Sequence, residues 1–233
     1  SVPEVIVPFA GDCPHRQKAL EWVTANHVWP VTVAYGGVPW VKAEAIRPAI
    51  EASSADIIVL ADADCWTDGL DEAVRAVELG APWAKPHRIV RRLSEASTRA
   101  FMAGESWTEL DQQPYHGVAG GGFVVARRET LLDIPMDPRF VGWGQEDIAF
   151  ALALHTLAGD AWLGDADLIH LWHPPQPRMT RMWGSPESKR LLKRYLAAKA
   201  KPDLMRSIVE EIHAHTNSFE SPLLHREPVV PDP

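Results

Sequence analysis

Short apolar runs alternate with longer amphipathic stretches in the first third of the chain. Runs rich in β-branched residues predict strands, and apolar residues three and four positions apart predict helices. Strands are therefore expected at 4–9, 31–35 and 57–60, and helices at 14–24, 41–52 and 69–79. Strands and helices that alternate with short connections are typical of a parallel sheet with right-handed crossover helices. This pattern predicts the α/β class with a mostly parallel central sheet flanked by helices.

The rest of the chain is less regular but continues both kinds of element. Apolar runs predict strands at 83–85, 123–126 and 166–171, and helical spacing predicts helices at 94–102, 146–157, 187–198 and 203–215. Residues 103–119 and 174–185 have no period and are expected to be loops, the second a candidate lid. No repeat or linker divides the chain, so we expect a single domain over 1–216 and an extended tail over 217–233.

The composition narrows the possible functions. The 233 residues carry a formal net charge of −8, which argues against broad, non-specific binding to nucleic acid or to an anionic membrane. Cys13 and Cys65 give neither a disulfide framework nor a metal-binding spacing, so a reducing, cytoplasmic setting is expected. No apolar run reaches the roughly 18 residues of a membrane span, and the first residues lack the pattern of a signal peptide.

Two carboxylates follow the third predicted strand directly, in Asp62-Ala63-Asp64. Ligands usually bind at the carboxyl ends of strands in an open α/β sheet, and residues i and i+2 of an extended chain point to the same side. Two oxygen donors at one point suit Mg²⁺ or Mn²⁺ and, through the metal, a diphosphate. A solvated surface turn would have the same sequence, so the motif alone does not settle its role.

A second candidate site is Gly142-Trp143-Gly144-Gln145-Glu146-Asp147, where two glycines surround a bulky aromatic residue. Glu146 and Asp147 begin a helix, whose amino terminus favours an ionised carboxylate of the kind that a general base requires. Helix capping is the alternative reading of the same acids.

Histidines and basic residues supply two further candidates. His170 and His173 follow the last predicted strand, where they could complete a metal site of mixed oxygen and nitrogen donors or be ordinary structural residues. Basic residues then reverse the local sign of charge, and they could neutralise a diphosphate or simply form a solvated helix face. They are Arg178, Arg181, Lys189, Arg190, Lys193 and Arg194.

The order of these motifs resembles that of metal-dependent glycosyltransferases of the GT-A fold. The similarity is greatest to the β-1,4-galactosyltransferase group and its bacterial and viral relatives, and the carboxyl-terminal half is similar to the polypeptide N-acetylgalactosaminyltransferases. It covers roughly residues 5–174, and its most specific part runs from Gly120 through Gly142 to Asp147. The resemblance implies transfer of a hexose from a nucleotide sugar, most simply a UDP-sugar, with Mn²⁺ or Mg²⁺ as cofactor.

The resemblance also implies a role for each matching residue. Nucleotide would be bound by Pro8, Phe9, Arg16 and Asp62, and metal by Asp64, His170 and His173. Trp143, Gly144 and Glu146 would bind substrate, and Asp147 would be the general base of an inverting displacement. In these terms residues 1–85 would bind nucleotide, 86–174 would hold acceptor and metal, and 175–216 would add the basic loop and helices.

The acceptor and some alternatives stay open. The galactosyltransferases usually carry further acids after Glu-Asp, whereas Ile148 follows here, so the acceptor could be a hydroxyl of a saccharide, a protein or a nucleic acid. The alternatives are a transferase that acts on modified nucleic-acid bases and a non-catalytic sugar-nucleotide-binding domain. A phosphohydrolase of the haloacid-dehalogenase type is disfavoured, because Trp66 stands where that family expects Thr or Val.

Overall fold

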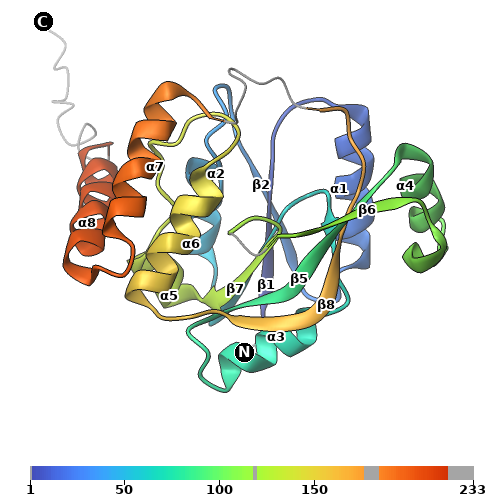
Figure 1. Ribbon diagram of the computed structural model, residues 1–233, viewed down its shortest axis with the longest axis horizontal. Coiled ribbons are helices and arrows are strands. Elements are labelled where there is room, and N and C mark those ends of the chain that lie inside the picture. Colours follow the sequence, from blue (N-terminus) through green and yellow to red (C-terminus); the bar gives the residue numbers. More distant parts are fainter. Residues whose placement is uncertain (1, 118–119, 176–183, 220–233) are drawn as a thin grey trace, which may run out of the picture.

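An eight-stranded sheet forms the centre of the computed structural model, which describes residues 2–117, 120–175 and 184–219 (Figure 1). The strands are β1 (Glu4–Phe9), β2 (Val31–Tyr35), β3 (Ile57–Ala61), β4 (Cys65–Trp66), β5 (Trp83–Leu93), β6 (Gln112–His116), β7 (Phe123–Arg127) and β8 (Trp162–His170). Seven of them lie in the order β2-β1-β3-β7-β5-β8-β4. The eighth, β6, pairs only with β5 and lies outside this order.

Helices cover both faces of the sheet. They are α1 (Pro14–Asn26), α2 (Lys42–Ala52), α3 (Leu70–Glu78), α4 (Glu95–Met102), α5 (Arg128–Asp133), α6 (Glu146–Leu157), α7 (Pro186–Ala198) and α8 (Pro202–Phe219), with a 3-10 turn at Trp107–Glu109. In Figure 1, α2, α5, α6, α7 and α8 lie to one side of the sheet and α1 and α4 to the other, with α3 beneath.

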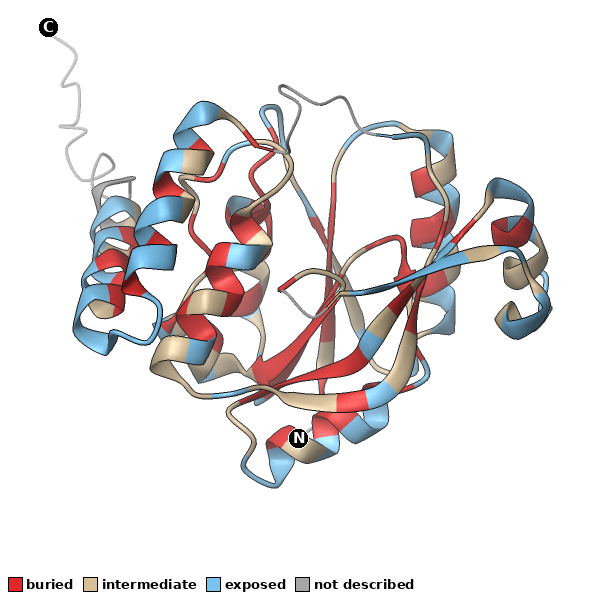
Figure 2. Ribbon diagram, viewed as in Figure 1, coloured by how far each residue is buried: buried red, intermediate tan, exposed pale blue. Residues whose placement is uncertain are grey.

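Alternate residues of the central strands enter two separate cores. Ile6 and Ile58 pack in the core that holds α2, α5, α6, α7 and α8, whereas Val5 and Val59 pack with apolar residues of α1 and α3. Because both faces are covered, β3 is buried along its whole length and its sequence is a continuous apolar run. Figure 2 shows the resulting concentration of buried residues on the strands and on the inner sides of the helices.

The α/β class is confirmed, but the sheet is mixed rather than mostly parallel. Three pairs are parallel, β1–β2, β1–β3 and β5–β8. Four are antiparallel, β3–β7, β4–β8, β5–β6 and β5–β7. A strand that is buried on both faces has the same apolar run in either direction, so the pattern of residues predicts β7 but not that it runs opposite to β3 and β5.

Most predicted elements are present, with differences at the ends. The strands at 4–9 and 31–35 and the helix at 146–157 have the predicted bounds. The predicted loop at 103–119 contains β6, and α5 was not predicted because it is only six residues long. Helix α8 extends to Phe219, into the predicted tail, and most of the second predicted loop lies outside the described residues.

Candidate metal and donor site

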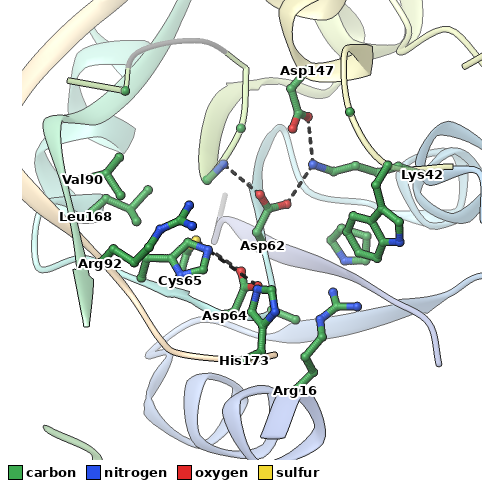
Figure 3. A pocket seen from close by; sticks show the side chains of 18 of the residues that line it. Arg16, Lys42, Asp62, Asp64, Cys65, Val90, Arg92, Asp147, Leu168 and His173 are labelled. Carbon is green, nitrogen blue, oxygen red and sulfur yellow. Dashed lines mark hydrogen bonds and ion pairs between the residues drawn. The ribbon is translucent and has the colours of Figure 1, made fainter. Parts of the chain in front are cut away.

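A cavity of about 560 Å³ opens at the carboxyl ends of β1 and β3 and at the amino terminus of α6 (Figure 3). Its walls include all but one of the residues to which the resemblance assigns a role: Pro8, Arg16, Asp62, Asp64, Trp143, Gly144, Glu146, Asp147, His170 and His173. The exception is Phe9, which is buried behind the cavity wall and contacts the guanidinium of Arg16 with its ring. Residues from five separate segments therefore meet at one place.

One carboxylate oxygen of Asp64 faces two imidazoles. The Nε2 atom of His173 lies 3.1 Å from Oδ2 of Asp64, and Nε2 of His170 lies 3.9 Å from the same oxygen. The three residues can offer one donor atom each, all within 4.8 Å of one another. The short strand β4 produces this arrangement, because Cys65 pairs with His170 in register and the N–H of Leu171 donates to the carbonyl of Asp64.

The surroundings of this cluster favour cation binding. Burial alone would raise the pKa of Asp64, but the charges of His170, His173 and Arg16 and a hydrogen bond from His173 hold that pKa well below its ordinary range. Nδ1 of His173 lies 2.8 Å from the carbonyl oxygen of Pro174. If Nδ1–H donates to that carbonyl, loss of the Nε2 proton that faces Asp64 would free the Nε2 lone pair for a metal ion. One carboxylate and two imidazoles suit Mn²⁺ better than the harder Mg²⁺.

Asp62 turns away from the metal cluster and is held by two donors (Figure 3). Its Oδ2 accepts the N–H of Gly122 at 2.8 Å, and its Oδ1 lies 2.8 Å from Nζ of Lys42. The same Nζ donates to Oδ1 of Asp147 at 2.9 Å. Lys42 thus connects Asp62, the acid that directly follows β3, with Asp147 at the start of α6. The two acids of Asp62-Ala63-Asp64 therefore have different partners.

Lys42 is the functional candidate that the sequence did not reveal. It is only 8% exposed, and burial by itself would lower its pKa, yet the charges of Asp147, Asp62 and Glu146 raise that pKa well above its usual value. Lys42 is therefore an ammonium ion. A lysine in the first turn of a helix gives no signal of burial, so only the positions of Asp62 and Asp147 identify its role.

The glycine-rich turn before β7 allows these groups to approach one another. A Cβ atom at Gly120 would overlap the backbone carbonyl of Asp147, and Gly122 has a φ of +78°. Beneath the turn, the fully buried Lys85 donates from Nζ to the carbonyls of Gly121 at 2.7 Å and Phe123 at 2.8 Å. The turn is thereby held against α6, with the N–H of Gly122 aimed at Asp62.

Arg16 supplies an unneutralised positive charge to the cavity wall. Its guanidinium lies over the rings of Trp143, at 4.5 Å, and Phe9, at 5.6 Å. The side chain is 6% exposed and its Nε has no hydrogen-bond partner; nor does any described carboxylate form a salt bridge with it. A buried arginine with aromatic packing and free N–H groups is suited to bind an anion such as a phosphate.

The turn that carries Trp143 has an unusual backbone. Gly142 and Gly144 have φ values of +84° and +100°, and Gln145, which precedes α6, has a φ of +75° that is rare for a residue with a side chain. Trp143 stacks on Trp40 with ring centroids 5.6 Å apart. This turn places the indole of Trp143 and the acids Glu146 and Asp147 on the same side of the cavity.

The opposite end of the cavity is formed by β5, β6 and β8 and contains Arg92 and Tyr115. Arg88 and Arg91 on the same strand form salt bridges with Asp165 and Asp167 of β8. Arg92 instead donates to the hydroxyl of Tyr115 at 3.3 Å, within the part of the chain that is described. Tyr115 falls in the segment 103–119, which the sequence indicated as a loop that could form part of an acceptor site, whereas Arg92 was missed because the predicted strand ended at residue 85.

The basic residues of α7 do not reach the cavity. Arg190 pairs with Glu187 of its own helix and Arg194 with Glu211 of α8, and no residue of α7 is among those that line the cavity. Their expected role with a diphosphate is thus wrong for the helix, which packs against α6 and α8 instead. Arg178 and Arg181 lie outside the described residues.

No protein-family model and no curated protein matches the sequence significantly, so the comparison with solved structures stands alone. GalNAc-T7, crystallised with UDP, GalNAc and Mn²⁺, matches 84% of this chain with 12% sequence identity and a TM-score of 0.53. The match covers 48% of that chain, so the present chain spans about half of its length.

A second similar structure has a lower TM-score. Glucosyl-3-phosphoglycerate synthase from Mycobacterium tuberculosis, crystallised with Mn²⁺, UDP-glucose and phosphoglyceric acid, matches 85% of this chain and 79% of its own. Its identity is 16% and its TM-score 0.49. At such identities the similarity establishes the fold, which is that of the GT-A glycosyltransferases. No helix of the described residues is long and apolar enough to cross a membrane.

Proposed function

We propose that this chain is a metal-dependent glycosyltransferase that moves a hexose from a UDP-sugar to an acceptor hydroxyl. The observation that carries the proposal is the convergence, in one cavity of about 560 Å³, of a three-donor metal cluster, an unneutralised arginine and a carboxylate paired with a lysine. The GT-A fold supports this combination over a chance grouping of polar residues.

The donor is expected to bind with its diphosphate between the metal cluster and Arg16. Asp64, His170 and His173 would hold Mn²⁺, which when bound supplies positive charge to a leaving diphosphate. Arg16 would pair with phosphate oxygens from the other side. Pro8 lies at the carboxyl end of β1 and Asp62 at that of β3, where they can contact the nucleoside.

Asp147 is the proposed general base. It stands at the amino terminus of α6, and its Oδ1 accepts a hydrogen bond from the ammonium of Lys42, which fixes its position. Its role would be to remove the proton of the acceptor hydroxyl as that oxygen attacks the anomeric carbon. A single base with no covalent intermediate predicts inversion of configuration.

The acceptor is expected to enter past β5 and β6. Tyr115, Trp172 and Arg92 line that end of the cavity and can pack against and hydrogen-bond to a polyhydroxylated molecule. Trp143, Gly144 and Glu146 would contact the sugar between the two ends. A saccharide, a protein or a nucleic-acid hydroxyl fits this description, as does a site on a modified base.

The decisive experiment is a screen of nucleotide sugars for nucleotide release and for transfer, each with and without Mn²⁺. The proposal expects metal-dependent turnover of at least one donor. Asp64→Ala is expected to abolish metal-dependent donor binding, whereas Asp147→Asn is expected to retain binding and lose turnover. Binding without turnover in the unmodified protein would instead identify a non-catalytic sugar-nucleotide-binding domain, and no binding of any nucleotide sugar would refute both.

A further inference from the structure

The two adjacent acids at the amino terminus of α6 differ in their partners. Asp147 has Lys42 at 2.9 Å, whereas Glu146 has no salt bridge to any described residue. Glu146 is also the more buried of the two, with 5% of its surface exposed, and its Oε2 has no hydrogen-bond partner. Both line the cavity. Neighbouring carboxyl groups of the same sequence motif therefore meet opposite electrostatic conditions.

A buried carboxylate without a counter-ion is costly, and such a group normally takes up a proton. Lys42 does not relieve this cost, because its Nζ is already bonded to Asp62 and Asp147. Burial first, and then repulsion from Asp147, raise the pKa of Glu146 to about 8; Asp62 adds to the increase and the charge of Lys42 opposes it. At neutral pH Glu146 is therefore mostly protonated.

We propose that Glu146 acts as a neutral carboxylic acid whose Oε2 donates a hydrogen bond to a hydroxyl or ether oxygen of the bound sugar. Asp147, whose Oδ1 accepts a hydrogen bond from Lys42, then has a different partner and a different role. The identity of the ligand rests on the proposed function, whereas the protonation state of Glu146 is a property of the chain alone. A carboxyl group kept neutral by its surroundings so that it can donate a hydrogen bond is a known catalytic device.

The competing assignment is that Glu146 is the general base, since a raised pKa also suits a base. The two assignments predict opposite responses to pH. A base gains activity as the pH rises through its pKa, whereas a hydrogen-bond donor loses it.

The first test contains no substrate. Melting temperatures of the wild type and of Glu146→Gln are compared from pH 5 to pH 9, with the exposed Glu44→Gln as matched control. Because the folded-state pKa lies above the unfolded value, the folded wild type binds more protons between them and loses stability as the pH rises. Glu146→Gln, which mimics the protonated acid, is expected to gain about 3–5 °C over wild type per pH unit between about pH 5 and pH 8, and the difference is expected to stay constant above pH 8.

A constant difference between Glu146→Gln and wild type between about pH 5 and pH 8 would overturn the proposal. Should Glu146→Gln not fold, the carbon-13 resonance of the Glu146 carboxyl in the wild type gives the same answer: a midpoint near pH 8 supports the proposal and one near pH 4 refutes it. A negative donor screen would refute the proposed function and leave these two measurements intact.

The second test uses the donor that the screen identifies. Wild-type transfer is expected to decline above pH 8, and this alkaline limb is expected to be absent from the profile of Glu146→Gln. Transfer that rises through pH 8 in the wild type, and is lost in Glu146→Gln at every pH, would make Glu146 the base and overturn the proposal.

Discussion

The two ends of the acid-lined part of the cavity differ in the source of their counter-charge. At the end near β4, Asp64 faces His170 and His173, and the three donors gather around space that a cation can share. At the end near α6, Asp62 and Asp147 share the single positive charge of Lys42. The first end is suited to bind a metal cation from solution, whereas the second end already contains a cation, the ammonium of Lys42. A metal-binding and a proton-accepting site can thus coexist within one cavity without competing for the same cation.

Removing the internal counter-charge is expected to have the largest effect. Lys42→Met would leave the half-buried Asp62 and Asp147 beside each other without a cation, and removing the buried partner of such ion pairs costs up to about 3–5 kcal/mol. The measurement is the free energy of unfolding by urea. Lys18→Met, at an exposed position of α1, is the control and is expected to change stability by less than about 0.5 kcal/mol. Equal stability of the two variants would show that Lys42 is not needed as a counter-ion.

Changing the other end is expected to affect binding. Asp64→Asn keeps the shape but removes the charge that His170 and His173 face, so Mn²⁺ affinity is expected to fall about 100-fold, equivalent to about 2.7 kcal/mol. Isothermal titration with Mn²⁺ measures this. Asp62→Asn is the matched comparison, and it is expected to retain most of the affinity because Asp62 is bonded to Lys42 and Gly122. Equal losses in both variants would contradict the division of the cavity.

Arg16 tests whether the anion site adjoins the metal end. Arg16→Gln is expected to weaken UDP binding in the presence of Mn²⁺ by about tenfold or more, the contribution of a hydrogen bond to a charged group. Arg92→Gln, on β5 beside His170, is expected to change UDP affinity by less than twofold, because Arg92 donates to the hydroxyl of Tyr115. A larger effect of Arg92 than of Arg16 would mean that the diphosphate lies toward β5.

The smallest effect is expected outside the cavity. Arg194→Gln breaks an exposed pair with Glu211, for which a loss of about 0–1 kcal/mol is typical. UDP affinity is expected to stay the same, because α7 does not line the cavity. A several-fold loss of UDP affinity in this variant would restore the basic face of α7 as a diphosphate site.

The contrast between β3 and Lys42 shows how much a single sequence can predict. The run Ile57-Ile58-Val59-Leu60 predicts its own burial, and a strand that ends in Asp-x-Asp places acids at the sheet edge where ligands bind. Local rules also predict the helix that begins at Glu146. No local rule indicates that Lys42 is buried, because its burial depends on Asp62, 20 positions later, and Asp147, 105 positions later.

The sequence by itself determined the alternation of strands and helices and the residue types available for chemistry, because apolar periodicity and side-chain chemistry are local properties. The tertiary structure decided which of those residues share a cavity. In the folded chain β7 runs antiparallel to its neighbours, and the pairing of β4 with β8 places His170 beside Asp64. Lys42 forms an ion pair with Asp147 and not with Glu146. The basic face of α7 lies outside the cavity. Long-range pairing and burial set these outcomes, and both depend on the whole chain.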